Sequence, residues 1–557
     1  MNQWILSRRT AVKALLAGSA AHFVMNSRAF ASSCDDHIVR LGGVTAPDTM
    51  NPFASWNVFW PLVFTYDWLV CVDAQRHPDR KGFAKEWSIA DDKLTWIFEI
   101  WPGMSWSDGQ PATARDAAFT YNYLRASMGT PDELNVGWNN TDGLENVESI
   151  KAIDDETLEI VTKVPTRWPI DNSTMIVPEH IWKEIRYADA RSTFRNEPPL
   201  VGTGPMIVSE FQQGQFVRFT PNPYFRTGKP ATAGAIFYLF NMADPIAQGL
   251  KSGSLDYGIH LTAAHWADLS KDSAIQVGES PVDQRDYLAF NTASEDGAGS
   301  TKALQDVAFR DAIGYAIDQK TIIDRTMRGH AAPGVGAIPP TFPDYYSDLS
   351  DIRRHFDLAE AGRRLDAAGY RDTNGDGVRE DQEGNSLRLE LITGSASGNL
   401  VIPVAAVQLI AGWLGQIGIP VSVIQLDPGA LDARTAAPKD GGGGWDLLIT
   451  NNWPNSNPYD LLRIGGSKQI GSTNRSYWKN EKFDELLSKI QLTVDSKKSQ
   501  ELVDQAVRVL YTEAPYIMLS YPFLLEAHRR DCFEGWGTKD ILSMSSYFPL
   551  DRLRPAP

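Results

Sequence analysis

The chain has 557 residues, of which 69 are acidic and 53 basic, and its formal net charge is −16 at pH 7. This length exceeds what one hydrophobic core usually serves, so we expect two or three domains. An acidic surface repels nucleic acid and anionic membranes, which excludes both as expected partners, and the three cysteines lack the spacing of a cysteine metal site.

The first 31 residues predict an export signal rather than part of a domain. Arg8 and Arg9 precede a modestly apolar stretch, Ala14–Met25, and a small-residue cleavage site ends at Ala31. The adjacent arginines resemble a twin-arginine signal, with an ordinary secretion signal as the alternative. Because "ASSC" is a poor lipidation sequence at Cys34, we expect a protein released into the bacterial periplasm. No later stretch is apolar over the length that spans a bilayer.

The first half of the remaining chain mixes strand and helix patterns. Residues 37–44 alternate like a strand, and residues 84–100 read as two strands joined by a polar hairpin. Residues 107–124 predict a turn and then a helix, with Thr113 as its N-cap and Asp116 in its first turn.

The second half continues in the same way. Residues 202–225 alternate as two further strands, residues 304–324 carry apolar side chains at helical spacing, and residues 357–370 predict a helix closed by Gly369. The apolar run at 445–450 predicts a buried strand. Strands and helices are thus mixed throughout the chain.

The loop "NNWPNSNPYD" at residues 451–460 follows that buried strand and carries no charge before Asp460. One interpretation is a surface turn, since Asn and Pro are turn residues. The other is the floor of a ligand site, because Asn side chains both donate and accept hydrogen bonds and a Trp face packs against sugar rings or aromatic groups.

Residues 372–383, "DTNGDGVREDQE", match the spacing of a calcium-binding loop. Side chains at its first, third, fifth and twelfth positions would converge on one cation. These candidate ligands are Asp372, Asn374, Asp376 and Glu383. An arginine at the eighth position argues against the motif, and an acidic turn without metal is the alternative. We expect at most a structural Ca²⁺ in this loop, away from any ligand, and no other cofactor.

The cysteines and histidines give less specific signals. One disulfide is possible among Cys34, Cys71 and Cys532, but the sequence does not select the pair. The nine histidines are scattered, and His260 and His265 are five residues apart, off the helix face that two ligands would share. A nickel site is therefore not expected.

Several of these segments, in this order, resemble the extracytoplasmic solute-binding proteins of ABC importers, specifically the peptide/nickel-type family (family 5, similar to oligopeptide- and dipeptide-binding proteins). The block at 84–124 resembles the signature strand, hairpin, "SDG" turn and helix of that family, and "GTGPM" followed by "NPYF" resembles a second landmark. Residues 287–292, 309–318 and 361–380 resemble three more, so the resemblance covers about residues 38–525.

The resemblance implies a two-lobed, type II-like periplasmic-binding-protein fold of the α/β class, with an extra domain inserted in lobe I and the ligand cleft between the lobes. Residues 287–292 and 514–522 would cross between the lobes. The implied division is a signal peptide at 1–31, lobe I at 32–286, lobe II at 287–514 and a return to lobe I at 515–557.

The resemblance also implies where ligand is bound. Lobe I would contribute loop residues and lobe II the loop after its buried strand; the candidates are Trp56, Asn57, Trp138, Asn139, Asn452, Trp453, Asn455 and Ser456. Peptide binders of the family place an aspartate a few residues after the Trp to hold the peptide's α-amino group. In this chain no acid lies between Asn451 and Tyr459, so recognition of a free amine is not expected at this point.

We therefore expect a monomeric periplasmic substrate-binding component of an ABC importer, which captures a bulky polar solute by lobe closure and delivers it to the permease subunits. An oligosaccharide or sugar conjugate ranks equally with an oligopeptide as the solute. The chain has no nucleophile-elbow, phosphate-loop or zinc-protease motif, so no catalysis is expected. The alternatives are a hydrolase acting on glycosides or peptides, and a chaperone-like interaction protein on the same fold.

Overall fold

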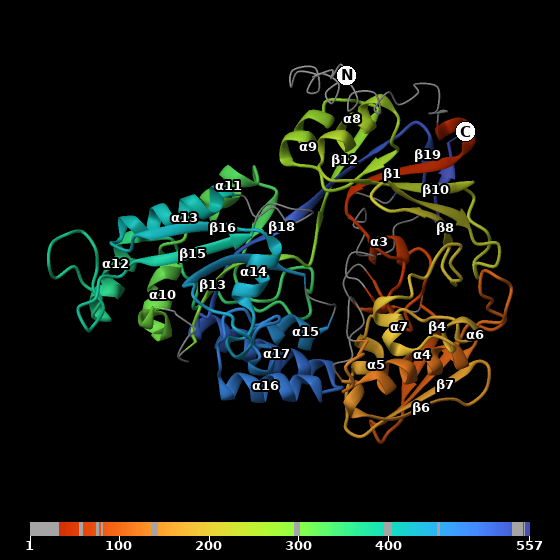
Figure 1. The fold of residues 1–557 in the computed structure, drawn as a ribbon, viewed down its shortest axis with the longest axis horizontal. Helices are drawn as coiled ribbons and strands as arrows, with labels where there is room; N and C mark the ends of the chain where they lie inside the picture. The colour runs from red at the N-terminus through yellow and green to blue at the C-terminus, as the bar shows by residue number, and fades with distance from the viewer. Residues whose placement is uncertain are drawn as a thin grey trace, which may run out of the picture.

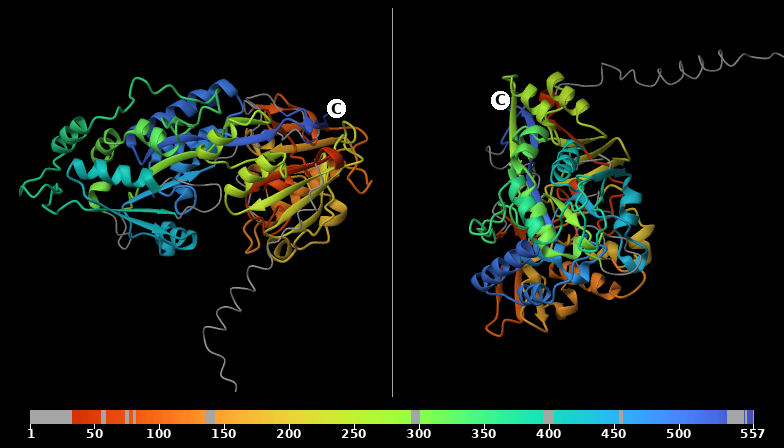
Figure 2. Two further views of the ribbon diagram at one scale, coloured as in Figure 1. Left: turned by 90° about the horizontal axis from the view of Figure 1, so that it is seen from above. Right: turned by 90° about the vertical axis from the view of Figure 1, so that its left-hand side faces the viewer.

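The computed structural model describes the following parts of the chain: 33–54, 59–73, 77–79, 82–134, 143–293, 301–394, 404–453, 457–536, 550 and 552–556. These residues form two bodies that lie side by side and are joined by the long strand β18, Tyr516–Arg529 (Figure 1). Figure 2 shows from above that the two bodies make an elongated molecule. The expected export signal at 1–31 lies outside the described residues.

Twelve of the strands form one continuous sheet that runs through both bodies, with β18 near its middle. Its main path is β16-β15-β17-β13-β18-β11-β1-β10-β9-β8, and β12 and β14 also pair with β18. The strands of this sheet are β1 (Ile38–Val44), β8 (Met206–Gln212), β9 (Phe216–Pro221), β10 (Gly234–Phe240), β11 (Tyr257–Gly258), β12 (Ile275–Pro281), β13 (Arg285–Phe290), β14 (Ala331–Pro333), β15 (Leu389–Gly394), β16 (Val421–Leu426), β17 (Leu447–Asn452) and β18.

We call the half of this sheet with β1, β8–β12 and the C-terminal part of β18 lobe I, together with residues 33–281 and 523–556. The half with β13–β17 and the N-terminal part of β18 is lobe II, residues 285–522. The change of partner along β18 is sharp, because Pro522 pairs with β14 whereas Phe523 pairs with β12. The predicted domain boundaries stay predictions; the predicted return to lobe I begins at 515, several residues before this change.

Lobe I carries a second, separate sheet of four antiparallel strands in the order β4-β5-β7-β6. Its strands are β4 (Ala84–Ile89), β5 (Thr95–Ile100), β6 (Val147–Ala152) and β7 (Thr157–Thr162). Helix α4 (Ala114–Ser127) packs against it and begins at Thr113, where a capping box with Asp116 satisfies the first free backbone amides. This inserted unit matches the expected extra domain.

In lobe II, helices cover both faces of the sheet, and the alternation of strand β13 shows why. Tyr287 and Ala289 belong to the apolar core on the side of the helices within 458–513 (α15–α17), whereas Leu288 and Phe290 belong to the core on the side of the helices within 307–416 (α10–α13). A strand buried on both faces reads as a continuous apolar run, as "YLAF" does. The fold is therefore the expected α/β fold with two lobes.

The remaining elements are mostly helices. In chain order they are α2 (Ser33–Asp36), α3 (Phe59–Leu62), β2 (Cys71–Val72), β3 (Pro78–Asp79), α5 (Trp168–Asp171), α6 (Glu179–Trp182), α7 (Tyr187–Ser192), α8 (Asp244–Ser252), α9 (Ala263–Leu269), α10 (Val307–Tyr315), α11 (Gln319–Thr326), α12 (Leu358–Ala367), α13 (Val404–Gln416), α14 (Pro428–Thr435), α15 (Pro458–Leu462), α16 (Glu481–Gln491), α17 (Ser496–Glu513), β19 (Phe533–Glu534) and β20 (Arg554–Pro555).

Most of the predicted elements are confirmed. The strands at 37–44, 84–100, 202–225 and 445–450 correspond to β1, β4 and β5, β8 and β9, and β17. The segment 304–324, which carries apolar side chains at helical spacing, forms the end of a short 3₁₀ turn and then two helices, α10 and α11. Asp318 caps α11 by accepting a hydrogen bond from the backbone amide of Thr321, which starts a new helix there.

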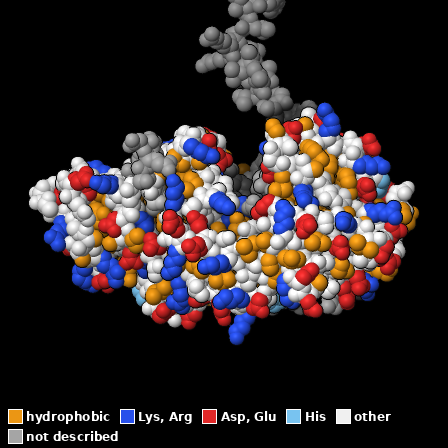
Figure 3. Space-filling view, turned by 90° about the horizontal axis from the view of Figure 1, so that it is seen from below, with side chains coloured by type: hydrophobic (Ala, Val, Ile, Leu, Met, Phe, Trp, Pro, Cys, Tyr) orange, Lys and Arg blue, Asp and Glu red, His pale blue; other side chains and the backbone are white. Residues whose placement is uncertain are grey.

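A disulfide joins the two ends of the described chain. Cys34 pairs with Cys532, with the two Cα atoms 4.6 Å apart, and Cys71 is a buried free thiol. In the described part of the chain, no helix combines the length and the apolar character that crossing a membrane requires. On the face in Figure 3, acidic and basic side chains are interspersed, with hydrophobic side chains between them.

Candidate functional site

Strand β17 brings the predicted ligand loop to the edge of the lobe II sheet. Leu447, Leu448 and Ile449 are almost fully buried, and burial decreases from Thr450 onward, where the chain leaves the core. Asn452 ends the strand, and both Asn452 and the following Trp453 are half-buried.

The side-chain oxygen of Asn452 is held by a buried arginine. Arg285, at the start of β13, donates from Nε and Nη2 to Oδ1 of Asn452 over 3.2 and 2.9 Å. The antiparallel register of β13 and β17 places these two residues opposite each other. The oxygen of Asn452 is therefore already occupied, and the amide presents its Nδ2–H donors only.

Arg285 is fully buried, and burial lowers its pKa to about 10. Its Nη1 donates to the backbone oxygens of Ala337 and, over 2.6 Å, Leu461. Among the described residues, no carboxylate pairs with this guanidinium, so its positive charge at neutral pH is met only by neutral oxygens. The environment behind Asn452 is consequently electropositive.

The segment after the loop contacts lobe I directly. Asn457 caps α15 by accepting from the amide of Asp460, and its Nδ2 donates to the backbone oxygen of Asp171 in lobe I over 3.2 Å. Arg167 pairs with Asp171 over 3.0 Å, and its Nη1 also donates over 3.3 Å to Ser496 in lobe II. Burial raises the pKa of Asp171, an effect that the Arg167 charge partly offsets.

A cavity of about 270 Å³ lies beside these contacts and is lined by both lobes. The indoles of Trp68 and Trp87 come from lobe I, and Tyr345 and Pro458 come from lobe II. His77 of lobe I and Asp344 of lobe II also line it, and their side chains are joined by a 3.0 Å hydrogen bond. Aromatic walls with a few polar groups are typical of a small-molecule site.

The structure places only part of the predicted ligand set. Asn452 and Trp453 lie together at the end of β17. Trp56, Asn57, Trp138, Asn139, Asn455 and Ser456 lie outside the described residues. Their contact with ligand stays a prediction.

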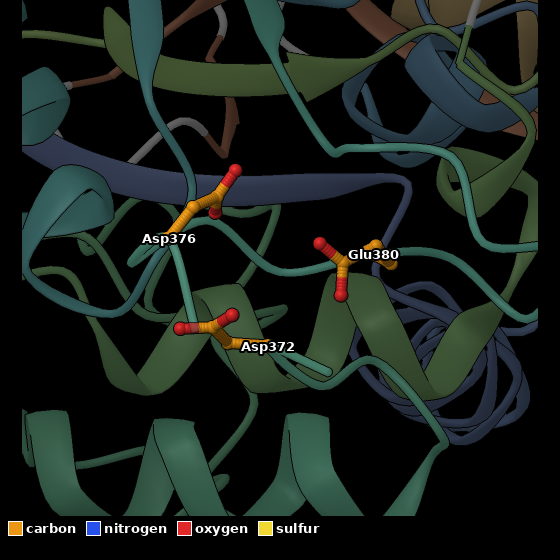
Figure 4. A group of neighbouring side chains, drawn as sticks. All are labelled: Asp372, Asp376 and Glu380. Atoms are coloured by element: carbon orange, nitrogen blue, oxygen red, sulfur yellow. The ribbon is translucent and has the colours of Figure 1, made fainter. Parts of the chain in front are cut away.

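The acidic loop brings together a set of side chains that differs from the predicted one (Figure 4). Carboxylate oxygens of Asp372, Asp376 and Glu380 lie within 4.8 Å of one another. Glu383 instead forms an ion pair with Lys302, and Asn374 donates from Nδ2 to Glu380 over 2.8 Å.

The difference has a local cause. Glu380 is almost fully buried by its backbone bridges to Arg371 and Ser386, and it accepts hydrogen bonds from the amide and hydroxyl of Thr373 over 2.7 and 2.8 Å. It occupies the ninth position of the loop motif, which often ligates calcium through water. The loop is thus closed by its own hydrogen bonds, and calcium binding stays a prediction.

Three residues of the site escaped the sequence analysis. Arg285 lies 167 residues from Asn452, so only the strand register pairs them. Asp171 is brought to the lobe boundary by tertiary packing. Asn457 could have been found, because Asn before Pro458 is a helix N-cap signal.

A comparison with known families identifies one match. The model described as "Bacterial extracellular solute-binding proteins, family 5 Middle" matches residues 80–472, which is more than half of the chain. Among curated proteins, the oligopeptide-binding protein AppA of Bacillus subtilis is 24% identical over 437 residues, which cover 78% of this chain and 76% of AppA.

Solved structures show the same fold. AppA from Bacillus subtilis in complex with a nonapeptide has a TM-score of 0.75 at 20% identity, covering 93% of this chain and 99% of that one. A mannohexaose-bound periplasmic oligopeptide-binding protein from Thermotoga maritima also has a TM-score of 0.75 at 20% identity, with coverages of 93% and 99%. At these identities the likeness concerns the fold alone.

Proposed function

The chain belongs to family 5 of the bacterial extracellular solute-binding proteins, and we propose that it captures a bulky polar solute between its two lobes and delivers it to the permease of an ABC importer. The fold suits this role, because hinged lobes that close around a ligand are a known mode of conformational change. The solute enters as cargo and leaves unaltered, without a catalysed reaction.

One observation carries the proposal most directly. The neutral loop that follows β17 begins at the half-buried Asn452 and Trp453 and, five residues later, reaches lobe I through the 3.2 Å hydrogen bond from Asn457 to Asp171. A solute held at the start of this loop would therefore bind beside the contact that forms when the lobes meet.

Two classes of solute fit this site. AppA is named an oligopeptide-binding protein, and the Thermotoga maritima protein was solved with mannohexaose. The aromatic cavity between the lobes suits the faces of sugar rings as well as peptide side chains. We propose an oligosaccharide, a sugar conjugate or an oligopeptide, handled in the bacterial periplasm after removal of the export signal.

A thermal-unfolding screen of oligopeptides and oligosaccharides tests this function. A ligand that binds only the folded state stabilises it by RT ln(1 + [L]/Kd), about 2.7 kcal/mol at a hundredfold excess over Kd. We expect at least one of these compounds to raise the melting temperature in this way. If no compound of either class changes the melt, the proposed function is wrong.

Trp453→Ala should abolish the ligand-induced stabilisation while leaving the unliganded melt nearly unchanged, because Trp453 is half-buried at the start of the loop. Trp413→Ala is the matched control: Trp413 is also half-buried in lobe II, but it packs against Phe356, with ring centroids 5.7 Å apart. An undiminished ligand response in Trp453→Ala would remove this residue from the site.

A further inference from the structure

We propose that the subsite at Asn452 binds a carboxylate of the solute through the Nδ2–H donors of this residue, with Arg285 as the positioning residue that orients the amide. The inference rests on the proposed function and deepens it, because it assigns a chemical group to one point of the ligand site.

The orientation of the Asn452 amide follows from the chemistry of its neighbour. A guanidinium only donates hydrogen bonds, so Arg285 can be satisfied at Asn452 only by the amide oxygen. Its two contacts, of 3.2 and 2.9 Å, both end on Oδ1. A flipped amide would set N–H groups against N–H groups. Nδ2 therefore points away from Arg285, and no described residue accepts a hydrogen bond from it.

The charge at this point is not neutralised by the described part of the protein. The other partners of Arg285 are the backbone oxygens of Ala337 and Leu461. Two buried acids that lie near Arg285 or Asn452 in the sequence have other partners. Asp286 accepts hydrogen bonds from Gln284 and Ser520, and Asp460 accepts from Asn457 and pairs with Arg463.

A buried cation without a paired carboxylate is costly unless an anion offsets it. Asn452 is itself the half-buried last residue of β17, and its amide offers N–H donors on the side away from this cation. A carboxylate accepts hydrogen bonds from such donors and is attracted by the charge behind them. An ammonium group would face both N–H donors and a positive charge, so this point rejects a peptide's amino terminus.

Two sources of a carboxylate fit the proposed solutes: the C-terminus of a peptide and an acidic sugar. Isothermal titration calorimetry at pH 7 should use tetra-alanine, its C-terminal amide and its N-acetyl form, together with tetragalacturonate and the neutral maltotetraose. We expect at least one acid-bearing probe to bind at least tenfold more tightly than its counterpart without a carboxylate. N-acetylation should change the affinity of tetra-alanine less than amidation does.

The variants separate positioning from folding. In Asn452→Asp, one carboxylate oxygen would pair with Arg285. The other oxygen, which only accepts hydrogen bonds, would stand in place of the Nδ2–H donors, so the preference for acid-bearing probes should be lost. Gln213→Glu, an equal charge change at an exposed position in the turn between β8 and β9 of lobe I, should keep that preference. Arg285→Lys keeps the positive charge but loses the paired N–H donors of the guanidinium that orient the Asn452 amide. It should therefore reduce the ratio of the affinity for acid-bearing probes to the affinity for probes without a carboxylate.

The inference would be overturned if probes with and without a carboxylate bound equally well, or if Asn452→Asp kept the preference for acid-bearing probes. Either result would leave the proposed function intact. If Arg285→Lys does not fold, Asn452→Asp carries the test alone. Failure of every probe to bind the folded wild-type protein would instead contradict the proposed peptide and sugar ligands, and the inference with them.

Discussion

Two carboxyl groups are buried on either side of the point where β18 passes between the lobes. Glu526 is fully buried on the lobe I side and accepts hydrogen bonds from the hydroxyls of Ser280, over 2.6 Å, and Tyr257. Asp286 is buried on the lobe II side. Burial raises the pKa of Glu526 to about 7 and that of Asp286 to about 6. Both groups therefore keep their protons to a higher pH than exposed carboxyl groups do.

This gives a pH prediction at the scale of one residue. Because the pKa of Glu526 is raised in the folded state, its stabilising contribution is fully present below its unfolded pKa and is lost as the pH rises through about 7. A shift of this size corresponds to about 3 kcal/mol. In chemical denaturation from pH 5 to 8, Glu526→Gln should show a smaller loss of unfolding free energy than the wild type.

The control for this measurement is Glu534→Gln, which removes an exposed carboxylate from the neighbouring β19 and should follow the wild-type pH dependence. If wild type and Glu526→Gln lose stability equally between pH 5 and 8, Glu526 is not neutral in the folded state.

At this scale the end of strand β17 could be predicted from the sequence, but the hydrogen bonding of Asn452 could not. Asn452 and Trp453 follow an apolar run, which marks the end of a buried strand. The donor-only state of Asn452 depends on Arg285, and no local pattern relates residues that only an antiparallel register brings together. For the same reason, the loop motif could not indicate that Glu383 forms an ion pair with Lys302.

At the scale of elements, the lobes meet where α5 of lobe I faces α15 and α17 of lobe II. Arg167, next to α5, donates to Ser496 at the start of α17, and His77 and Asp344 form a second contact across the lobes. These bonds exist only while the lobes touch, so they stabilise the closed arrangement.

The double variant Ser496→Ala with Asp344→Ala should therefore weaken ligand binding without unfolding either lobe. Each hydrogen bond contributes about 0.5–1.5 kcal/mol, so together they predict an affinity loss of roughly 5- to 150-fold, measured by calorimetry. Ser488→Ala, at an exposed position on α16, should bind as the wild type does. Unchanged affinity in the double variant would show that these contacts do not stabilise the bound state.

The elements themselves were largely predictable, because caps and turns are local. Thr113 and Gly369 fixed two helix ends correctly. The break between α10 and α11 was missed, since the apolar spacing continues across it and only the cap at Asp318 interrupts the helix.

At the scale of the whole molecule, the disulfide between Cys34 and Cys532 connects positions 498 residues apart. A link that closes so long a loop restricts the unfolded chain, and removing one typically costs about 2–5 kcal/mol. Reduction should lower the melting temperature of the wild type but leave the melt of a Cys34→Ser/Cys532→Ser variant unchanged. Identical melts of the wild-type protein with and without reductant would contradict this role.

The two-lobed plan could be predicted from the order of segments, but the exact crossing between lobes could not. Strand β18 keeps one continuous strand pattern while its partners change between Pro522 and Phe523. Strand β18 shifts its register against β13 between Met518 and Ser520, just before this change of partner. The strand is buried along most of its length, so no alternation in its sequence marks either point, and the boundary depends on the tertiary arrangement.

Lobe closure around the solute is the central claim, and a distance measurement between the lobes tests it most directly. Spin labels can be attached at Ile153→Cys, in the inserted unit of lobe I, and at Leu492→Cys, after α16 of lobe II, because both positions are exposed. Pulsed electron paramagnetic resonance should show a shorter and narrower distance distribution when a ligand from the thermal screen is added to saturation. A distribution that stays the same at saturation would contradict closure.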